Sequence, residues 1–313
     1  MIEFIVKVDD KIYEISEMVT KISFRDSLND GCSKLEFSYV NKDLNIKNGS
    51  FVRFSYKDVG IFQGYVFKAS RGKGMEISIT AYDQLRYCKA KDTVYTKDKT
   101  VSSITEQMCN YFHLKKGVIA KSEYLLTTGV QDDKSWLDII YSAISDTLLH
   151  KKKWYVLRDE FGSITLREIG DLELKLIIGD SSLCYDYKHE LSIDDEFYNL
   201  IKLVIKDEET KSAEVIVSKD DKSVSTYGLL QYYKDVDKKF NTSQIKEMAD
   251  NLLSLYNKEA ESVSFECIGD TSIRAGNSFQ AIIEDINLNQ RLIVKSVTHN
   301  FIPNHTMSLE VMA

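Results

Sequence analysis

Proline is the residue that this sequence most nearly lacks, because its 313 residues include only Pro303. Average usage of about 5% would give roughly fifteen prolines. The turns must therefore depend on Gly, Asn and Asp, which favour turn conformations for other reasons. Hydrophobic residues still make up 43% of the chain and can form a core, which excludes wholesale disorder.

The sequence also lacks long apolar runs and clustered cysteines. No run approaches the ~18 apolar residues of a spanning helix, and the first nine residues alternate like a strand, so we expect neither membrane insertion nor a secretion signal. The cysteines are scattered, with no C-x-x-C spacing, which predicts free thiols in a reducing cytoplasm. They are Cys32, Cys88, Cys109, Cys184 and Cys267.

A basic excess is missing as well. The chain has 41 Lys and Arg against 48 Asp and Glu, which gives a formal charge of −7. A protein that binds duplex nucleic acid needs a local excess of Lys and Arg, so the net negative charge argues against that function.

Short runs with a period of two dominate the first and last parts of the chain. Several lie within residues 1–87, where 51–56 and 61–67 flank a predicted hairpin turn at 57–60. Strands resume after Gly179. These runs predict small, strongly curved sheets or barrels.

Helical spacing occurs in three places. One helix begins after the cap residue Thr100, and a second begins after Ser135, with Asp138 in the reciprocal capping position. The third covers about 242–257 and has Asn241 as its cap.

Two pairs of segments resemble each other. Residues 24–37 match 189–202 with Ser27 over Ser192, and 48–52 match 275–279 with Gly49 over Gly276. The offset grows from 192 − 27 = 165 to 276 − 49 = 227 residues, so the second copy carries 62 additional residues, including the third helix. We interpret this as one β domain present twice.

The predicted fold is therefore α+β and dominated by strands. Two related β-barrel domains occupy residues 1–90 and 176–313, and a small α/β insert at 91–175 separates them. The insert contains the first two helices and a hairpin at 154–169. The second barrel carries the helix at about 242–257.

Candidate metal and phosphate sites are weak. Cys109 and His113 have a spacing that suits one metal ion, but no further ligand stands at a recognisable interval, so we expect a buried thiol and a nearby imidazole. The segment 71–74 is too short for a phosphate loop and lies between strands, so we expect a hairpin turn.

The histidines near the C-terminus have an acid/base interpretation. His299 and His305, with Asp270 or Asp285, could form such a pair, but a turn held by polar side chains is favoured.

The charge clusters also favour structural interpretations. We expect the acidic residues at 194–196 and 207–209 to form solvated turns, and the lysines at 151–153 to interact with a helix dipole. We assign no catalytic, cofactor-binding or metal-ligating residue.

A series of short stretches along the chain matches one known family. The first are 60–67, 77–87 and 91–93, followed by the helix after Thr100. The others are 192–195, 227–231, Ala249, Leu252-Leu253, 269–270, 274–276, 297–299 and 305–309. In these stretches the chain resembles the baseplate hub proteins of contractile phage tails, in particular those of PBSX-type prophages and phage-tail-like bacteriocins.

The resemblance implies a structural protein with no catalytic residues and no cofactor. It implies a homotrimer in which six tube-like β domains form a ring below the tail tube, with a trimeric spike beneath and other baseplate and tape-measure proteins as partners. Such a protein is made in the bacterial cytoplasm and incorporated into a virion or a phage-like tail particle. The acidic balance suggests a lumen through which DNA passes without specific binding. A genome-carrying phage and a bacteriocin both remain open.

Two alternatives remain. A tail-associated peptidoglycan hydrolase would use the candidate set Cys184, Asp186 and His189. A cell-wall-binding module is suggested by 18 tyrosines, although cross-strand packing also explains them.

Overall fold

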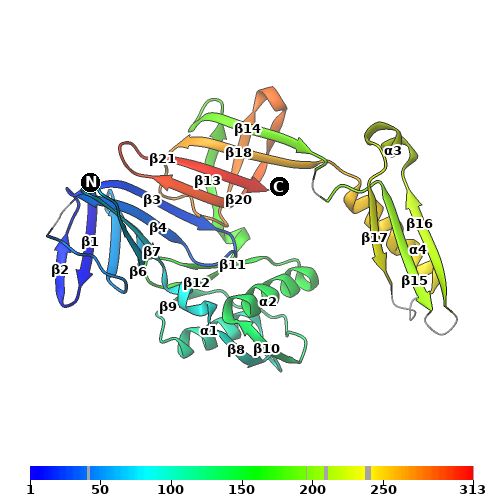
Figure 1. Ribbon diagram of the computed structural model, residues 1–313, viewed down its shortest axis with the longest axis horizontal. Helices are drawn as coiled ribbons and strands as arrows, with labels where there is room; N and C mark the ends of the chain where they lie inside the picture. Colours follow the sequence, from blue (N-terminus) through cyan, green and yellow to red (C-terminus); the bar gives the residue numbers. More distant parts are fainter. Residues whose placement is uncertain (41–42, 195, 208–210, 237–240, 313) are drawn as a thin grey trace. The chain divides into compact units, whose positions relative to one another are not determined.

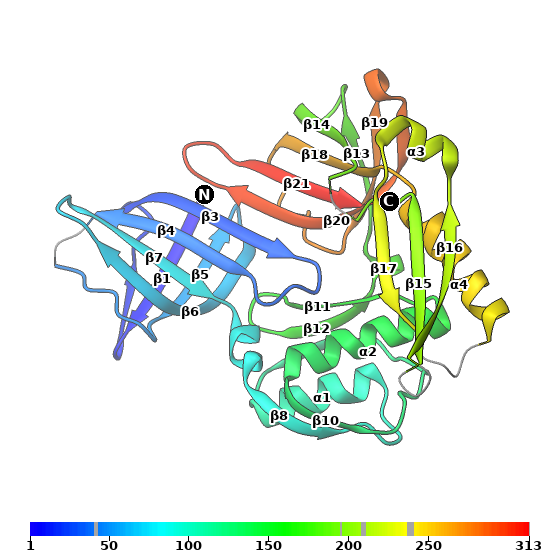
Figure 2. The ribbon, with the colours of Figure 1, turned by 45° about the vertical axis from the view of Figure 1, so that its right-hand side comes forward.

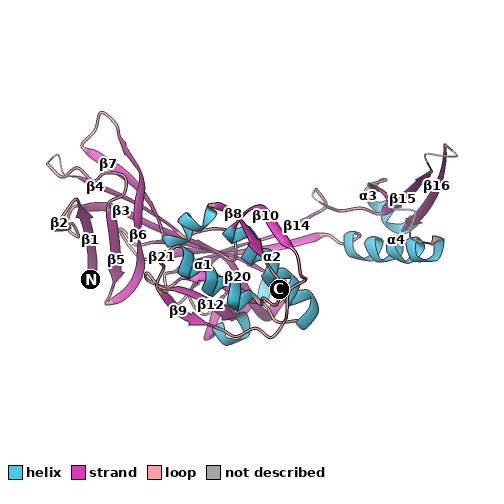
Figure 3. Cartoon of the chain, turned by 90° about the horizontal axis from the view of Figure 1, so that it is seen from below, coloured by secondary structure: helices cyan, strands magenta, loops and turns pink. Residues whose placement is uncertain are grey.

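The computed structural model describes residues 1–313 apart from 41–42, 195, 208–210, 237–240 and 313. The chain forms two compact units: unit 1 comprises Met1–Lys188 and Ser264–Ala313, and unit 2 comprises His189–Val263. Strands dominate the structure, as the sequence predicts (Figures 1 and 3). No helix among the described residues is long and apolar enough to span a membrane.

The first seven strands form one half of the main sheet. They are β1 (Ile2–Val8), β2 (Lys11–Glu14), β3 (Val19–Ser27), β4 (Lys34–Val40), β5 (Phe51–Tyr56), β6 (Val59–Arg71) and β7 (Glu76–Tyr82). The period-two pattern places Phe4, Phe37 and Phe54 in the core, with the Phe4 ring 4.5 Å and 5.4 Å from the other two. The β5–β6 hairpin forms as predicted, since Lys57 and Asp58 adopt positive φ in its turn.

The middle of the chain contains the helices of unit 1. Its elements are η1 (Gln84–Lys89), β8 (Lys91–Tyr95), α1 (Val101–Tyr111), β9 (Lys116–Ile119), β10 (Val130–Ser135), α2 (Trp136–Lys151), β11 (Tyr155–Asp159), β12 (Ile164–Glu168) and η2 (Ile169–Leu172). Thr100 and Ser135 cap α1 and α2, as expected. Apolar residues of both helices, including Ile104 and Ile140, pack with Leu157 of β11.

Six more strands form the other half of the main sheet. They are β13 (Glu173–Gly179), β14 (Cys184–Ser192), β18 (Ala260–Ile268), β19 (Ser278–Ile283), β20 (Leu288–Asn300) and β21 (Thr306–Met312), with η3 (Glu284–Ile286) between β19 and β20. β20 pairs with β19, β21 and, through residues 296–300, with β3 of the first half. Figures 1 and 2 show β20 and β3 side by side.

The two halves have the same strand order. The first runs β3-β4-β7-β6-β5-β1, and the second runs β14-β18-β21-β20-β19-β13. β3 ends at Ser27 and β14 ends at Ser192, the residues that the sequence comparison aligned. One pairing differs in direction, because β1 is antiparallel to β5 whereas β13 is parallel to β19.

The expected closed barrels are not confirmed. The main sheet runs from β14 at one end to β2 at the other, and among the described strands it does not return on itself. β3 pairs with β20 of the other half and thereby extends the sheet. The proposed division at residues 90 and 175 stays a prediction.

Unit 2 lies between β14 and β18 of the second half of the main sheet. It contains β15 (Leu200–Asp207), β16 (Ser212–Lys219), α3 (Asp221–Tyr227), β17 (Gln231–Asp235) and α4 (Thr242–Tyr256). The strands form the sheet β16-β15-β17, against which Ile245 and Ala249 of α4 pack. Asn241 and Gln244 form the capping box of α4, in agreement with the predicted helix start.

One detail of the predicted alignment is wrong. It placed residues 200–202 over the start of β4, but these belong to β15 in the separate sheet of unit 2. In strand order the counterpart of β4 is β18. An alternating strand after an acidic turn has the same pattern whether it continues a sheet or begins an insertion, so the sequence could not distinguish the two.

Candidate functional site at the junction of three segments

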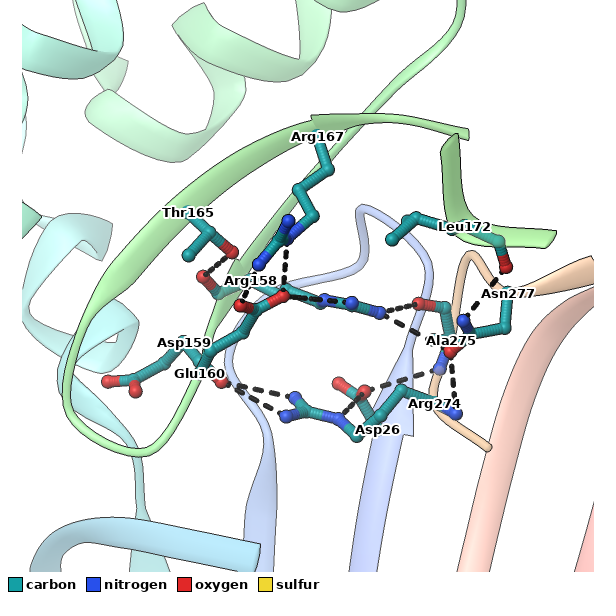
Figure 4. Close-up of polar contacts among 10 residues, drawn as sticks. All are labelled: Asp26, Arg158, Asp159, Glu160, Thr165, Arg167, Leu172, Arg274, Ala275 and Asn277. Carbon is teal, nitrogen blue, oxygen red and sulfur yellow. Dashed lines mark hydrogen bonds and ion pairs between the residues drawn. The ribbon is translucent and has the colours of Figure 1, made fainter. Parts of the chain in front are cut away.

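Buried charged side chains join β3, the β11–β12 hairpin and the turn at 274–277 (Figure 4). Asp26 Oδ2 accepts hydrogen bonds from Arg274 Nε at 2.6 Å and from the Ala275 amide at 3.3 Å. The Arg274 guanidinium also donates to the backbone carbonyl of Asp159 at 3.2 Å and lies 5.2 Å from the centre of the Phe24 ring. One arginine thus connects segments from three parts of the chain.

A second arginine binds the same turn from the hairpin. Arg158 Nη1 donates to the Ala275 carbonyl at 3.1 Å, and Arg158 Nε donates to Glu160 Oε1 at 2.9 Å. Arg167 holds both oxygens of Glu160, at 2.8 Å and 2.6 Å. Burial by itself raises the pKa of Glu160, but the hydrogen bonds from Arg167 and the charge of Arg158 outweigh it and lower that pKa to about 2. Glu160 is therefore ionised and holds both arginines in place.

Two buried carboxyl groups lie beside this network. Asp83 accepts hydrogen bonds from the amide and hydroxyl of Ser33, at 2.7 Å and 2.5 Å, and from the Leu85 amide at 2.9 Å. Burial, followed by repulsion from Asp159, raises the pKa of Asp83 to about 8. Asp159 accepts from the Gly162 amide at 2.5 Å. The pair therefore holds a proton at neutral pH.

The turn at 274–277 has the conformation of the turn at 47–50. Gly49 and Gly276 have φ of 86° and 88°. Their amides donate to Val66 and Val294 carbonyls, at 2.7 Å and 2.9 Å. The sequence alignment of Gly49 with Gly276 is thus supported by backbone geometry.

The two turns differ in what covers them. At Gly276 a Cβ atom would lie 3.0 Å from Val156 of the hairpin, whereas at Gly49 it would meet nothing within 4 Å. Lys47, the counterpart of Arg274, forms an exposed ion pair with Asp9 at 3.1 Å. The second turn is therefore a packed junction and the first is open.

The candidate metal residues do not come together as a site. Cys109 is buried in α1, and burial raises its pKa to about 11. His113 follows α1 with a φ of 53°. Within the described residues, no group of three or more His, Cys, Asp or Glu side chains could hold a metal ion.

The two C-terminal histidines do contact each other. His299 Nδ1 lies 3.0 Å from His305 Nε2, and His299 Nε2 lies 2.9 Å from the Ile273 carbonyl. Burial lowers the pKa of His299 to about 4, so its ring is neutral at physiological pH. Asp285 lies elsewhere, with Oδ2 3.4 Å from the Tyr187 hydroxyl. The arrangement suits the predicted turn held by polar side chains.

The candidate hydrolase set has other partners. Cys184 Sγ donates to the Asp186 carbonyl at 3.1 Å, and His189 Nε2 lies 2.9 Å from Glu261 Oε1. Burial raises the pKa of Cys184, which disfavours the thiolate that a nucleophile needs.

The charge clusters have structural surroundings where they are described. Lys151 ends α2, Lys152 is its C-cap, and Lys153 pairs with Glu168 at 3.3 Å. The predicted turn at 71–74 joins β6 and β7. Parts of the acidic clusters, Asp195 and 208–209, lie outside the described residues.

A family model described as YQBQ-like matches residues 22–312. The chain belongs to this family. It is 26% identical over 273 residues to the uncharacterized protein YqbQ of Bacillus subtilis, covering 86% of this chain and 82% of that protein. It is 24% identical over 272 residues to the phage-like element PBSX protein XkdQ of the same organism, with the same coverage. The predicted resemblance to PBSX-type prophage proteins is confirmed.

Solved structures of phage tail proteins share the fold. The 43 kDa tail protein of prophage MuSo2 from Shewanella oneidensis has a TM-score of 0.68 at 13% identity, covering 99% of this chain and 98% of that one. A tail protein from Neisseria meningitidis has a TM-score of 0.65 at 13% identity, covering 99% and 96%.

Sequence reasoning missed the charge network of this YQBQ-like chain. Asp26 and Arg274 are 248 positions apart, and nothing in either segment indicates that they pair. Asp26 lies inside one repeated segment and Arg274 directly precedes another, but the repeat does not indicate that these two residues pair.

Proposed function

We propose that the protein is a structural hub subunit of a contractile phage or phage-like tail, and that three copies form a ring of six related β domains. The observation that carries this proposal is the pairing of β3 with β20, which joins the two copies inside one chain. The confirmed family relationship supports a tail component, and the resemblance found in the sequence supplies the number of three subunits.

Among the described strands, two sheet edges have no partner strand, and they are equivalent to the two edges that meet where β3 pairs with β20. β14 is the counterpart of β3 and ends the main sheet. β6 is the counterpart of β20, and both strands have 13 residues and an irregularity at the equivalent position, between Val66 and Lys68 and between Val294 and Ser296. Residues 68–71 of β6 pair with β7 on one side and are exposed.

The same contact can therefore be repeated between chains. If β14 of one subunit pairs with β6 of the next as β3 pairs with β20, the sheet continues from subunit to subunit. Such head-to-tail contacts close into a ring when the rotation allows it. A ring of alternating copies has threefold symmetry and nearly sixfold shape, which suits a sixfold tail tube on one side and a trimeric spike on the other.

The role of the ring is assembly and not catalysis. Its partners would be the tube protein, the spike and other baseplate and tape-measure proteins. A net charge of −7 favours a lumen that repels phosphate, so that DNA passes without specific binding. A structure of the ring with a lumen lined mainly by Lys and Arg would contradict this last point.

A designed disulfide tests the ring directly. In the internal contact Arg25 pairs with Thr298, so the equivalent pair between chains is Glu190 with Ser70. Both side chains are exposed in the isolated chain. We expect the variant Ser70→Cys with Glu190→Cys to form covalent dimers and trimers under mild oxidation, seen on non-reducing gels and by light scattering behind a sizing column.

The matched control shifts one cysteine by one residue. In Ser70→Cys with Leu191→Cys the two side chains would point to opposite faces of the sheet, so no crosslink is expected. Equal crosslinking in both variants would indicate random collision between chains. If neither variant crosslinks at concentrations where the protein is trimeric, the proposed pairing of β14 with β6 is wrong.

A further inference from the structure

Two of the five cysteines face each other across neighbouring strands. β14 leaves unit 1 after Lys188 and β18 re-enters it at Ser264, so these adjacent strands run in opposite directions (Figure 1). The Ile268 amide donates to the Leu183 carbonyl at 2.9 Å. This bond sets the register and places Cys184 directly opposite Cys267, in a pair without backbone hydrogen bonds between its two residues.

That position suits a disulfide. Opposite residues in such a pair have Cα atoms about 4.5 Å apart, which lies within the range that disulfides span. The two thiols are near neighbours, because, after burial, the Cys184 thiol contributes to the raised pKa of Cys267. Cys267 is fully buried, and Cys184 is partly exposed, so a dissolved oxidant can reach Cys184 first.

We propose that Cys184 and Cys267 form a reversible disulfide that ties β14 to β18 where the chain passes between its two units. This differs from the expectation that all five thiols stay free, and it agrees with the free cysteines of the present structure, which represents the reduced form. It stands on strand register alone and does not depend on the hub proposal.

Glutathione disulfide can oxidise the two thiols in two exchange steps. The Cys184 thiol loses its proton, and its sulfur attacks one sulfur of glutathione disulfide, which releases one glutathione thiolate and leaves a mixed disulfide. The Cys267 thiol then loses its proton and attacks Cys184 Sγ, which releases the second glutathione. Each released thiolate takes up one proton, so two protein thiols are oxidised and one glutathione disulfide is reduced.

Burial slows this reaction at neutral pH. It raises the pKa of both thiols, so the reactive thiolate is scarce and the exchange is expected to accelerate as the pH rises. The pair therefore tolerates brief exposure to oxidant and forms its bond over longer times outside a reducing compartment.

Peptide mapping of the full-length protein tests the proposal. The reduced protein is incubated with glutathione disulfide, its remaining thiols are alkylated, and its peptides are analysed by mass spectrometry. We expect two of the five thiols to escape alkylation and one crosslinked peptide pair that contains Cys184 and Cys267. Treatment with a reductant should restore five alkylated thiols.

Two cysteine variants distinguish the disulfide between Cys184 and Cys267 from other oxidation products. Cys267→Ser should give a glutathione adduct on Cys184 and no crosslink, while Cys32→Ser, which removes another partly exposed thiol, should crosslink as the wild type does. A wild-type protein that accumulates the Cys184 adduct while Cys267 remains alkylatable would overturn the proposal. So would crosslinks that join Cys184 to other cysteines. The wild-type map needs no variant, so it decides the question even if a substitution prevents folding.

Discussion

The two halves of the main sheet, which we interpret as two copies of one β fold, share a strand order but differ at equivalent turns. The turn at 47–50 is open, and its lysine pairs at the surface with Asp9. The turn at 274–277 has the same backbone hydrogen bonds but is covered by the β11–β12 hairpin, and its arginine is bound to the largely buried Asp26. One backbone design therefore serves either as a surface turn or as the centre of a junction, depending on what packs against it.

The connection between β3 and β4 also differs from its counterpart, the connection between β14 and β18. In the first copy residues 28–33 join β3 and β4, and Asn29 holds β11 through the Tyr155 carbonyl at 2.8 Å and the Leu157 amide at 3.0 Å. In the second copy the corresponding connection contains most of unit 2. The first copy thus uses this turn to fix the α/β segment, and the second copy uses it to carry an added unit.

The largest expected effect is the loss of the buried ion pair. Arg274→Met leaves Asp26 buried without its cation, which should lower the free energy of unfolding by about 3–5 kcal/mol. Lys47→Met at the equivalent open position should change it by no more than about 0.5 kcal/mol, because that pair is exposed. Urea denaturation of both variants measures the difference.

A double variant controls for the buried charge. Asp26→Leu with Arg274→Met removes both charges, so it should lose less stability than Arg274→Met alone. Equal losses in Arg274→Met and Lys47→Met would show that the two turns are equivalent after all.

The next effect concerns the two glycines. Gly49→Ala has only the positive φ to oppose it and should cost about 1 kcal/mol. Gly276→Ala meets the same cost and also presses against Val156, so we expect about 2–3 kcal/mol in total. Thermal unfolding of both variants compares them, and a larger loss at Gly49 would mean that the open turn is covered in solution.

These contrasts show what the sequence can and cannot predict. The helix caps, the β5–β6 hairpin and the alignment of Gly49 with Gly276 depend on neighbouring residues or on a repeated local pattern, and they are correct. The counterpart of β4 and the pairing of Asp26 with Arg274 depend on segments far apart in the chain. The alternation of apolar and polar residues predicts which face of a strand is buried, but it does not identify the strand that pairs with it. The order of strands in the sheet and the charge network could therefore not be predicted from the sequence.

A smaller effect concerns pH at the covered junction. The folded-state pKa of Asp83 is about 8, above its usual value of 3.8, so between these values the folded protein binds a proton that the unfolded chain lacks. Unfolding then releases this proton, and the free energy of unfolding should fall as the pH rises, by up to about 2.6 kcal/mol between pH 5 and pH 7. Asp83→Asn resembles the protonated carboxyl group and should flatten this part of the profile. An unchanged slope would show that Asp83 is ionised in the folded protein.

The smallest effect is expected from exchanging the two connections. Replacing residues 193–259 by the sequence of 28–33 would give the second copy the short turn of the first and remove most of unit 2. The main sheet keeps its strand order and unit 2 has a core of its own, so unit 1 should fold with a free energy of unfolding changed by less than about 1 kcal/mol. Hydrogen exchange of the β20 and β21 amides reports on unit 1 alone and should be the same in both proteins. Faster exchange there would show that unit 2 helps to hold the second copy together, and the two copies would then differ in stability as well as in what covers their turns.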